Sequence, residues 1–472
     1  MTDAIIQRDQ DLCTGCQRCA DNCPTGAIEG ERGQPQAVRE EKCVQCGQCV
    51  EICSAYDSVF DENLLPRPDR LKARHLPGSL TEPLFAVFDR GFLDEVRAAL
   101  AEENVCAVAQ CDSTVASALA EDFGHVPGTL SLGHLAAALR KLGFRKVYNT
   151  NSLAALPVLE EAHELLDRLN CGRVLPVIDS SCPATVKFIE QAYPELLHYL
   201  STCKSPSQVA GAICKSEGAR MWDVDPARIY SVSVGPCTSR KFEAGRAELR
   251  AEGRPERREV DAVLTTRELA YLLKGAGLDP FTLPEEEMDT DLAAISWLSH
   301  VYCTTGDVTQ AVLRTCAEFA GEGAAGPAPR LSGDGQAEGA RVASLTVNGY
   351  NIKGLAVSGL RNAIPFFEAL KAGKREFGFL EARACPLGCV SGGGQPKVLL
   401  PQDKPPVYAE RASVTAIEAD DAPDRLSEHP AARQAYEYFG KPCGDKSNRV
   451  LHTRYEDRSG EAASPLSPAP CK

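Results

Sequence analysis

Two runs of cysteines with identical spacing stand near the start of the chain. The first reads Cys-x2-Cys-x2-Cys-x3-Cys-Pro from Cys13 to Pro24, and the second repeats it from Cys43 to Cys53, with Ser54 in place of the proline. Cysteines at this spacing ligate iron–sulfur cubanes, three from one run and the last from the other. A pair of zinc knuckles would be expected to carry histidines and looser spacing. The repeat therefore predicts a small domain with two 4Fe-4S clusters.

The two runs resemble a bacterial two-cluster ferredoxin, and this resemblance covers residues 1–63. It implies one small α+β domain in which each run contributes ligands to both clusters. The first cluster would be held by Cys13, Cys16, Cys19 and Cys53, and the second by Cys43, Cys46, Cys49 and Cys23. Because clusters in one small domain lie close enough for electron transfer, the domain is predicted to conduct electrons to or from another centre.

Composition and charge limit which cellular compartment and which classes of partner are expected. The formal charge of −14 disfavours nucleic acid and anionic membranes, because either needs a basic surface, but it is compatible with a basic redox protein. The sequence shows no signal peptide and no run of roughly 18 apolar residues that would cross a membrane. We therefore expect a cytoplasmic protein whose 21 cysteines ligate metal rather than form disulfides.

Beyond a proline-rich linker predicted at residues 64–80, short apolar runs alternate with segments of helical periodicity. Strands are predicted at residues 105–109, 146–148, 173–178, 228–234, 260–263 and 377–380, and helices at residues 135–142, 153–169 and 267–274. Such alternation is typical of α/β domains with mostly parallel sheets, whose ligands bind where strands end. The large domain is expected to span residues 81–410.

Single cysteines stand at three of these predicted strand ends. Cys182 follows one strand, Cys237 follows another, and Cys385 and Cys389 follow a third, just before a glycine triplet at residues 392–394. Glycine lets backbone approach a ligand closely. The alternatives are a glycine-rich surface turn and buried structural thiols, since a lone cysteine is usually a small core residue. Four cysteines at one face, downstream of an electron-transfer domain, favour a further cluster.

These segments and the two cysteine runs resemble the FeFe hydrogenases over almost the whole chain. The resemblance implies a domain of two α/β lobes that holds an H-cluster, which is a 4Fe-4S cluster bridged to a two-iron subsite with carbonyl, cyanide and azadithiolate ligands. Cys182, Cys237, Cys385 and Cys389 match the ligand positions, with Cys389 as the bridging thiolate. Residues 411–455 resemble the small subunit of the family. Residues 322–341 and the tail at 456–472 are expected to be flexible.

The resemblance also implies a proton relay between the two-iron subsite and the surface. Its positions fall on Ser181, Glu161, Ser201 and Glu164, with the two glutamates on one helix face. Ser181 stands where the family has a cysteine. Because a hydroxyl has a far higher pKa than a thiol, this substitution predicts slow turnover. From the residues alone, the two glutamates could equally be solvated charges on a helix.

Further departures from the family pattern concern charged and small residues near the site. Arg240 stands where the family has a lysine that contacts a cyanide ligand, and a guanidinium is a wider, forked donor. Gly235 and Arg383 replace methionines. These substitutions are predicted to retune the surroundings of the cofactor, although the purpose of Arg383 is not readable from the sequence.

Two extra cysteines fall at the same site. Cys111 and Asp112 lie in a segment, residues 110–113, where the family commonly has a proline and a small residue near the two-iron subsite, and Cys303 replaces a glycine. We hypothesise that Cys111 or Cys303 supplies the relay thiol that position 181 lacks. The alternative interpretation is that both are buried structural thiols.

Three functions fit this sequence. The first is a hydrogenase that exchanges electrons with a ferredoxin or another redox protein and depends on hydrogenase maturation proteins for its two-iron subsite. The second is a sensory or low-turnover hydrogenase, which the altered surroundings of the site favour. The third is a non-catalytic iron–sulfur protein of the same family, which the four intact ligand cysteines and the glycine triplet disfavour.

Overall fold

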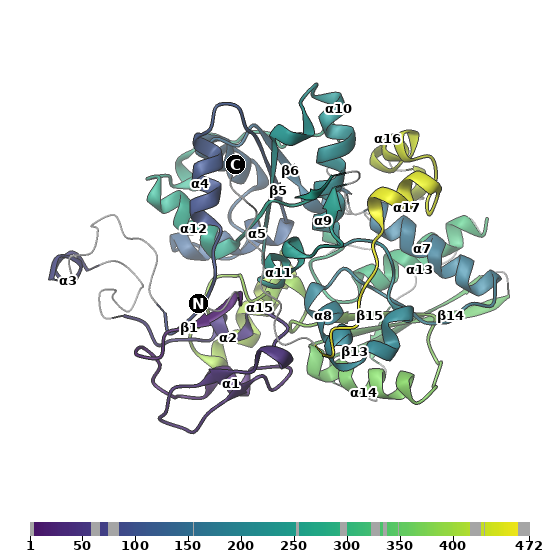
Figure 1. Cartoon of the computed structure of the whole chain (residues 1–472), viewed down its shortest axis with the longest axis horizontal. Helices are drawn as coiled ribbons and strands as arrows, with labels where there is room; N and C mark the ends of the chain where they lie inside the picture. The colour runs from purple at the N-terminus through teal and green to yellow at the C-terminus, as the bar shows by residue number, and fades with distance from the viewer. Residues whose placement is uncertain are drawn as a thin grey trace.

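The N-terminal part of the computed structural model is a small α+β domain (Figure 1). The structure describes residues 4–57, 67–73, 85–153, 155–251, 254–292, 300–321, 331–333, 338–347, 349–415, 426–428 and 430–460. β1 (Ile6–Arg8) pairs antiparallel with β4 (Val87–Asp89), and β2 (Ile28–Glu29) pairs with β3 (Ala37–Val38). The short helices α1 (Arg18–Asp21) and α2 (Gln48–Glu51) carry the third cysteine of each run.

The segment that joins this domain to the rest of the chain differs from a plain linker. Of residues 64–80 the structure describes 67–73, where a short helix, α3 (Pro68–Ala73), forms with Pro68 at its first position. The pairing of β4 with β1 also places residues 87–89 with the N-terminal domain, although the sequence predicts the large domain from residue 81.

The first lobe of the large domain is built on a parallel sheet in the order β11-β8-β5-β6. Its strands are β5 (Cys106–Cys111), β6 (Lys146–Asn149), β8 (Ile229–Gly235) and β11 (Ala262–Thr265). One face packs on apolar side chains of α4 (Leu93–Ala101), α5 (Ser113–Leu119), α6 (Leu132–Leu142) and α12 (Thr266–Gly275), and the other packs on α9 (Pro206–Ile213). The strands are buried on both faces, which is why they read as nearly continuous apolar runs.

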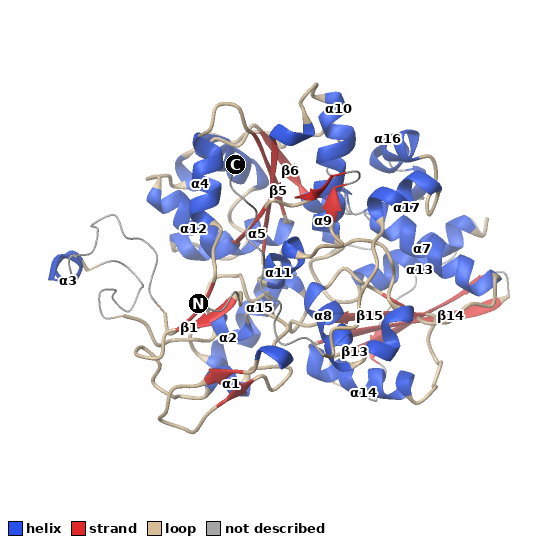
Figure 2. Cartoon of the chain, in the orientation of Figure 1, coloured by secondary structure: helices blue, strands red, loops and turns tan. Residues whose placement is uncertain are grey.

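The second lobe is built on a mixed sheet in the order β12-β13-β14-β15-β7 (Figure 2). β14 (Tyr350–Ser358), β15 (Phe379–Arg383) and β7 (Val177–Ile178) run parallel, whereas β12 (Ser332–Gly333) and β13 (Ala340–Val347) are antiparallel to their neighbours. α7 (Ala155–Asn170) and α13 (Asp307–Phe319) cover one face, and α8 (Pro183–Ala192) and α14 (Leu360–Lys371) cover the other. The two lobes confirm the predicted α/β architecture.

Two details of the sequence prediction are wrong. Residues 322–341 are not flexible throughout, because β12 and the first two residues of β13 lie in the part that the structure describes, and Ala340 is buried. The strand predicted at residues 173–178 is reduced to β7, since Pro176 has no N–H to donate to a ladder. Residues 322–330, 334–337 and 461–472 lie outside the described residues.

The C-terminal elements join the domains together. In α15 (Lys404–Ser413), the hydroxyl of Tyr408 donates to Glu51 Oε2 at 2.6 Å and Lys404 Nζ pairs with the same oxygen at 2.9 Å. α16 (Pro430–Phe439) packs on α7, and α17 (Asp445–Leu451) packs on α9, as the yellow helices of Figure 1 show. None of the described helices is long and apolar enough to cross a bilayer.

Candidate iron–sulfur site

Both lobes contribute thiols to one site. Cys182 caps the N-terminus of α8, Cys237 follows β8, and Cys385 and Cys389 follow β15. Cys385 interacts electrostatically with the three others, and Cys237 interacts with Cys182 and Cys389. Burial raises the pKa of Cys237 to about 12 and that of Cys389 to about 11. Iron would therefore have to displace protons from these thiols.

The glycine triplet packs backbone against backbone. A Cβ on Gly392 would lie 2.3 Å from the carbonyl oxygen of Pro236, and a Cβ on Gly393 would lie 2.2 Å from that of Cys46. The N–H of Gly394 donates to the carbonyl of Pro236 at 2.7 Å. The glycines thus bring the loop of Cys389 against the loop of Cys237 and against the second N-terminal cysteine run, a contact between motifs that the sequence does not predict.

The N-terminal thiols fall into two groups. Cys23 lines a small cavity together with Cys43, Cys46 and Cys49. Cys53 interacts electrostatically with Cys19, which also interacts with Cys16. The last cysteine of each run thus lies among the cysteines of the other. The assignment of individual ligands to the two clusters stays a proposal.

The second cysteine run lies directly on the candidate site. Cys46 interacts electrostatically with Cys385. The hydroxyl of Thr238 donates to the carbonyl of Gln45 at 2.6 Å, and that of Ser239 donates to the carbonyl of Val44 at 2.9 Å. The second cysteine run and the segment that follows Cys237 are therefore in direct hydrogen-bond contact.

Arg240 has a carboxylate partner at the site. Its Nη1 lies 2.8 Å from Asp112 Oδ2, and both side chains are buried. Arg240 also interacts electrostatically with Cys237 and Cys389. A Cβ on Gly235 would lie 2.5 Å from Nη1, so the glycine makes room for the guanidinium. The departures at positions 112, 235 and 240 therefore form one structural unit.

Arg383 belongs to a buried charge network. Its Nε donates to Glu381 Oε1 at 3.0 Å, its Nη2 lies 3.3 Å from Asp179 Oδ2, and its Nη1 donates to the hydroxyl of Ser181. Glu381 in turn accepts from the N–H groups of Gly306 and Thr309, at 3.0 Å each, at the start of α13. The arginine therefore balances two carboxylates beside the ligand loop.

The proton relay predicted from the sequence is present only in pieces. Ser201 Oγ donates to Glu164 Oε2 at 2.9 Å, and Ser181 Oγ donates to Asp179 Oδ2 at 2.7 Å. Burial, then the charge of Asp179, raises the pKa of Glu161 well above its usual range, so this carboxyl is neutral and bonded to Asp179. No described contact joins Glu161 to Ser201.

Asp179 is the residue that sequence reasoning missed. It is fully buried and links Ser181 to Glu161. The sequence did contain a signal for Asp179, because this carboxylate comes directly after the short apolar run at residues 177–178. A charge at the end of a buried strand needs a buried partner.

Cys111 and Cys303 are both fully buried. Cys111 packs in the apolar core of the first lobe. Cys303 interacts electrostatically with Asp112 and Cys389, and its carbonyl accepts from the N–H of Val390 at 3.1 Å. Burial raises the pKa of both thiols well above the usual range. Of the two, Cys303 lies nearer the candidate ligands.

Several buried polar atoms around the thiols have no hydrogen-bond partner among the described residues. They are Asp112 Oδ1, Thr305 Oγ1 and Gln395 Oε1. Such atoms are rare in native interiors, and an ordered water or a polar group outside the chain can satisfy them. Together with four converging thiols, they fit a large iron–sulfur cofactor with polar ligands.

Fold and site together define an iron–sulfur protein in which a two-cluster domain is packed against a two-lobed α/β domain. The family described as iron only hydrogenase large subunit, C-terminal domain, matches residues 105–393, and a 4Fe-4S dicluster domain matches residues 5–54. The chain belongs to the iron-only hydrogenase family.

Individual relatives include hydrogenases and assembly factors. The chain is 36% identical over 398 residues to the periplasmic Fe hydrogenase large subunit of Nitratidesulfovibrio vulgaris, covering 83% of this chain and 86% of that protein. It is 27% identical over 346 residues to the cytosolic Fe-S cluster assembly factor narfl of Danio rerio, covering 68% and 79%. A solved variant of the FeFe-hydrogenase HydA1 from Chlamydomonas reinhardtii has a TM-score of 0.70 at 30% identity, covering 79% of this chain and 100% of that chain.

Proposed function

We propose that the chain is an FeFe hydrogenase that interconverts H2 with two protons and two electrons. The observation that carries the proposal is the convergence of Cys182, Cys237, Cys385 and Cys389 beside an N-terminal cysteine run. These four residues would hold the H-cluster, with Cys389 bridging to the two-iron subsite. When bound, this cofactor supplies the iron and amine chemistry that splits H2 heterolytically.

Two arginines would set the polarity around the cofactor. Arg240 is paired with Asp112 and interacts electrostatically with Cys237 and Cys389, so its guanidinium would donate to polar diatomic ligands held at these thiols. Arg383 places a permanent positive charge near Cys389 and Cys182. Its partners Asp179 and Glu381 keep the network from carrying excess positive charge.

Protons would move through a relay with a carboxylate in place of the missing thiol. Ser181 passes a proton to Asp179, and Asp179 exchanges it with Glu161. Glu164, bonded to Ser201, lines a surface pocket and would complete the path to solvent. A carboxyl pair that shares a proton suits this role better than a hydroxyl alone, because a carboxyl group is a far stronger acid than an aliphatic hydroxyl.

Electrons would enter and leave through the N-terminal domain. The close packing of Gly393 against the carbonyl of Cys46 supports transfer between the second N-terminal cluster and the H-cluster. A ferredoxin or similar redox protein would be the outer partner, and maturation proteins would deliver the two-iron subsite. A cytoplasmic location remains the expectation from the sequence.

The similarity to an assembly factor suggests a second candidate, a non-catalytic iron–sulfur protein. The buried hydrogen bonds that link Ser181 to Asp179 and Asp179 to Glu161 favour catalysis, because a protein that moves no protons does not need such a series of acidic side chains. The serine at position 181, in place of the family's cysteine, also fits a sensory or low-turnover hydrogenase.

Gas exchange tests the proposed reaction and the new relay residue together. The matured full chain is expected to evolve H2 from a reduced viologen dye, and Asp179→Asn is expected to lower the rate by about 100-fold, because the amide carries no proton. A matured wild-type chain that evolves no H2 would support the assembly candidate instead.

Two sets of variants control this experiment. Glu381→Gln also removes a carboxylate from Arg383 but lies off the relay, so its turnover should fall far less. Cys111→Ala and Cys303→Ala should leave turnover close to wild type, and Ser181→Cys should raise it. A loss in Cys303→Ala as large as that in Asp179→Asn would restore the hypothesis of a cysteine relay.

A further inference from the structure

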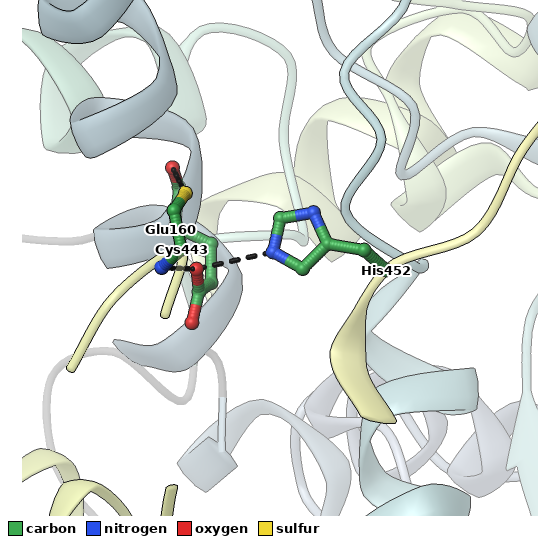
Figure 3. A group of neighbouring side chains, drawn as sticks. All are labelled: Glu160, Cys443 and His452. Carbon is green, nitrogen blue, oxygen red and sulfur yellow. Dashed lines mark hydrogen bonds and ion pairs between the residues drawn. The ribbon is translucent and has the colours of Figure 1, made fainter. Parts of the chain in front are cut away.

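Three side chains from distant parts of the chain meet at the outer side of α7. They are Glu160 of α7, Cys443 in the turn before α17, and His452 at the end of α17 (Figure 3). One oxygen, one sulfur and one nitrogen of these residues all lie within 4.8 Å of one another. With bonds of about 2.0–2.3 Å to a central ion, the atoms need to approach by only about 1 Å to share it.

Neighbouring groups hold two of these side chains in position. The hydroxyl of Tyr436 donates to Glu160 Oε1 at 2.8 Å, and Thr202 Oγ1 lies 2.8 Å from His452 Nδ1. The imidazole therefore turns its Nε2 toward Glu160 Oε2, 3.1 Å away (Figure 3). Metal-binding histidines in proteins are commonly fixed in this way through the nitrogen that does not bind the metal.

The trio is open to solvent on one side. Cys443 and His452 line a surface pocket of about 650 Å³, together with Thr202 and Glu164. An ion can therefore enter from solution, and water in the pocket can supply its fourth ligand. Glu160, the third member of the trio, is fully buried.

We propose that Glu160, Cys443 and His452 form a zinc site. Thiolate, imidazole and carboxylate are the donors that zinc takes, whereas calcium and magnesium require oxygen ligands throughout. The carboxyl group of Glu160 accepts hydrogen bonds from the hydroxyl of Tyr436 and from the backbone N–H of Cys443, and its Oε2 lies 3.1 Å from His452 Nε2. Zinc would replace the His452–Glu160 hydrogen bond and the hydrogen bond from the Cys443 thiol to the Glu160 carbonyl with metal bonds, and the thiol proton would leave to solvent.

The position of the site gives it a consequence that rests on the proposed function. Glu160 directly precedes Glu161, and Glu164 lines the same pocket. A bound dication would oppose the passage of protons at the outer end of the relay. Zinc is therefore expected to inhibit H2 turnover.

The site is tested on the cluster-loaded full chain, in which iron occupies the other ligand cysteines, by titration with Zn²⁺ against a chromophoric chelator. We expect a single tight equivalent, with one sulfur in the zinc X-ray absorption spectrum. Thr202→Val should weaken binding by about 10- to 100-fold, and Cys443→Ser by about 100-fold or more. The matched controls are Cys171→Ser, an exposed cysteine just beyond α7, and His198→Asn, which lines the same pocket.

Equal zinc affinities in Cys443→Ser and Cys171→Ser would overturn the site, as would a spectrum with only nitrogen and oxygen ligands. Inhibition of H2 evolution by zinc should weaken in Cys443→Ser in parallel with the affinity. A matured chain without H2 turnover would end the proposed function but leave the zinc titration as a valid test of the site.

Discussion

Replacing Arg383 by methionine is expected to lower the free energy of unfolding by about 3–5 kcal/mol, which is the usual cost of removing one member of a buried ion pair. The guanidinium is 3% exposed and lies against Asp179 and Glu381, which are both completely buried. Methionine fills similar volume but leaves both carboxylates without a cation. The loss is measured by denaturant unfolding of chains that carry equal amounts of iron.

If the stability loss in Arg383→Met comes from unpaired carboxylates, removing one of these carboxylates should restore part of the stability. Asp179→Asn combined with Arg383→Met should recover part of the loss, because only Glu381 then lacks its cation. Arg375→Met is the matched control, since Arg375 is exposed and bonds to backbone carbonyls. A loss in Arg383→Met no larger than in Arg375→Met would mean that the network contributes little to stability.

Glu161→Gln is expected to lower H2 turnover by about 10²- to 10⁴-fold, the range typical of a lost acid–base group. Glutamine has the shape of the neutral carboxyl and keeps its hydrogen bond to Asp179, but it cannot release a proton. The assay is gas exchange by the matured chain. Asp167→Asn is the control, because Asp167 lies on the same helix and pairs with Arg173 at the surface.

The pH dependence of the free energy of unfolding distinguishes a relay role of Glu161 from a structural role. Burial, and then the charge of Asp179, raises the folded-state pKa of Glu161, so the folded chain holds this proton more tightly than the unfolded chain. The wild type therefore loses stability as pH rises above the ordinary glutamate range, and Glu161→Gln removes that loss. A variant that is both destabilised at neutral pH and only slightly slower would contradict the relay assignment.

The sequence allowed the α/β lobes and the grouping of four cysteines at one site to be predicted because both depend on local patterns. Apolar runs mark buried strands, and Cys182, Cys237 and Cys385 come directly after them, where parallel sheets bind ligands. The antiparallel strands β12 and β13 escaped prediction because β12 lies in a segment rich in glycine and alanine.

The charge networks could not be predicted because they depend on which strands are neighbours. Leu380 pairs with Ile178 in the register of β15 and β7, and this register brings Arg383 to Asp179 and Ser181. Nothing local to either segment reveals that pairing. The zinc trio is harder still, since Glu160 and His452 lie 292 positions apart.

Infrared spectroscopy of the full chain after maturation tests the central claim most directly. If Cys182, Cys237, Cys385 and Cys389 hold an H-cluster, the spectrum will show the carbonyl and cyanide stretching bands of the two-iron subsite, and Cys389→Ser will abolish them. A chain that carries its full complement of 4Fe-4S clusters but shows no such bands after maturation would contradict the assignment and favour a non-catalytic iron–sulfur protein.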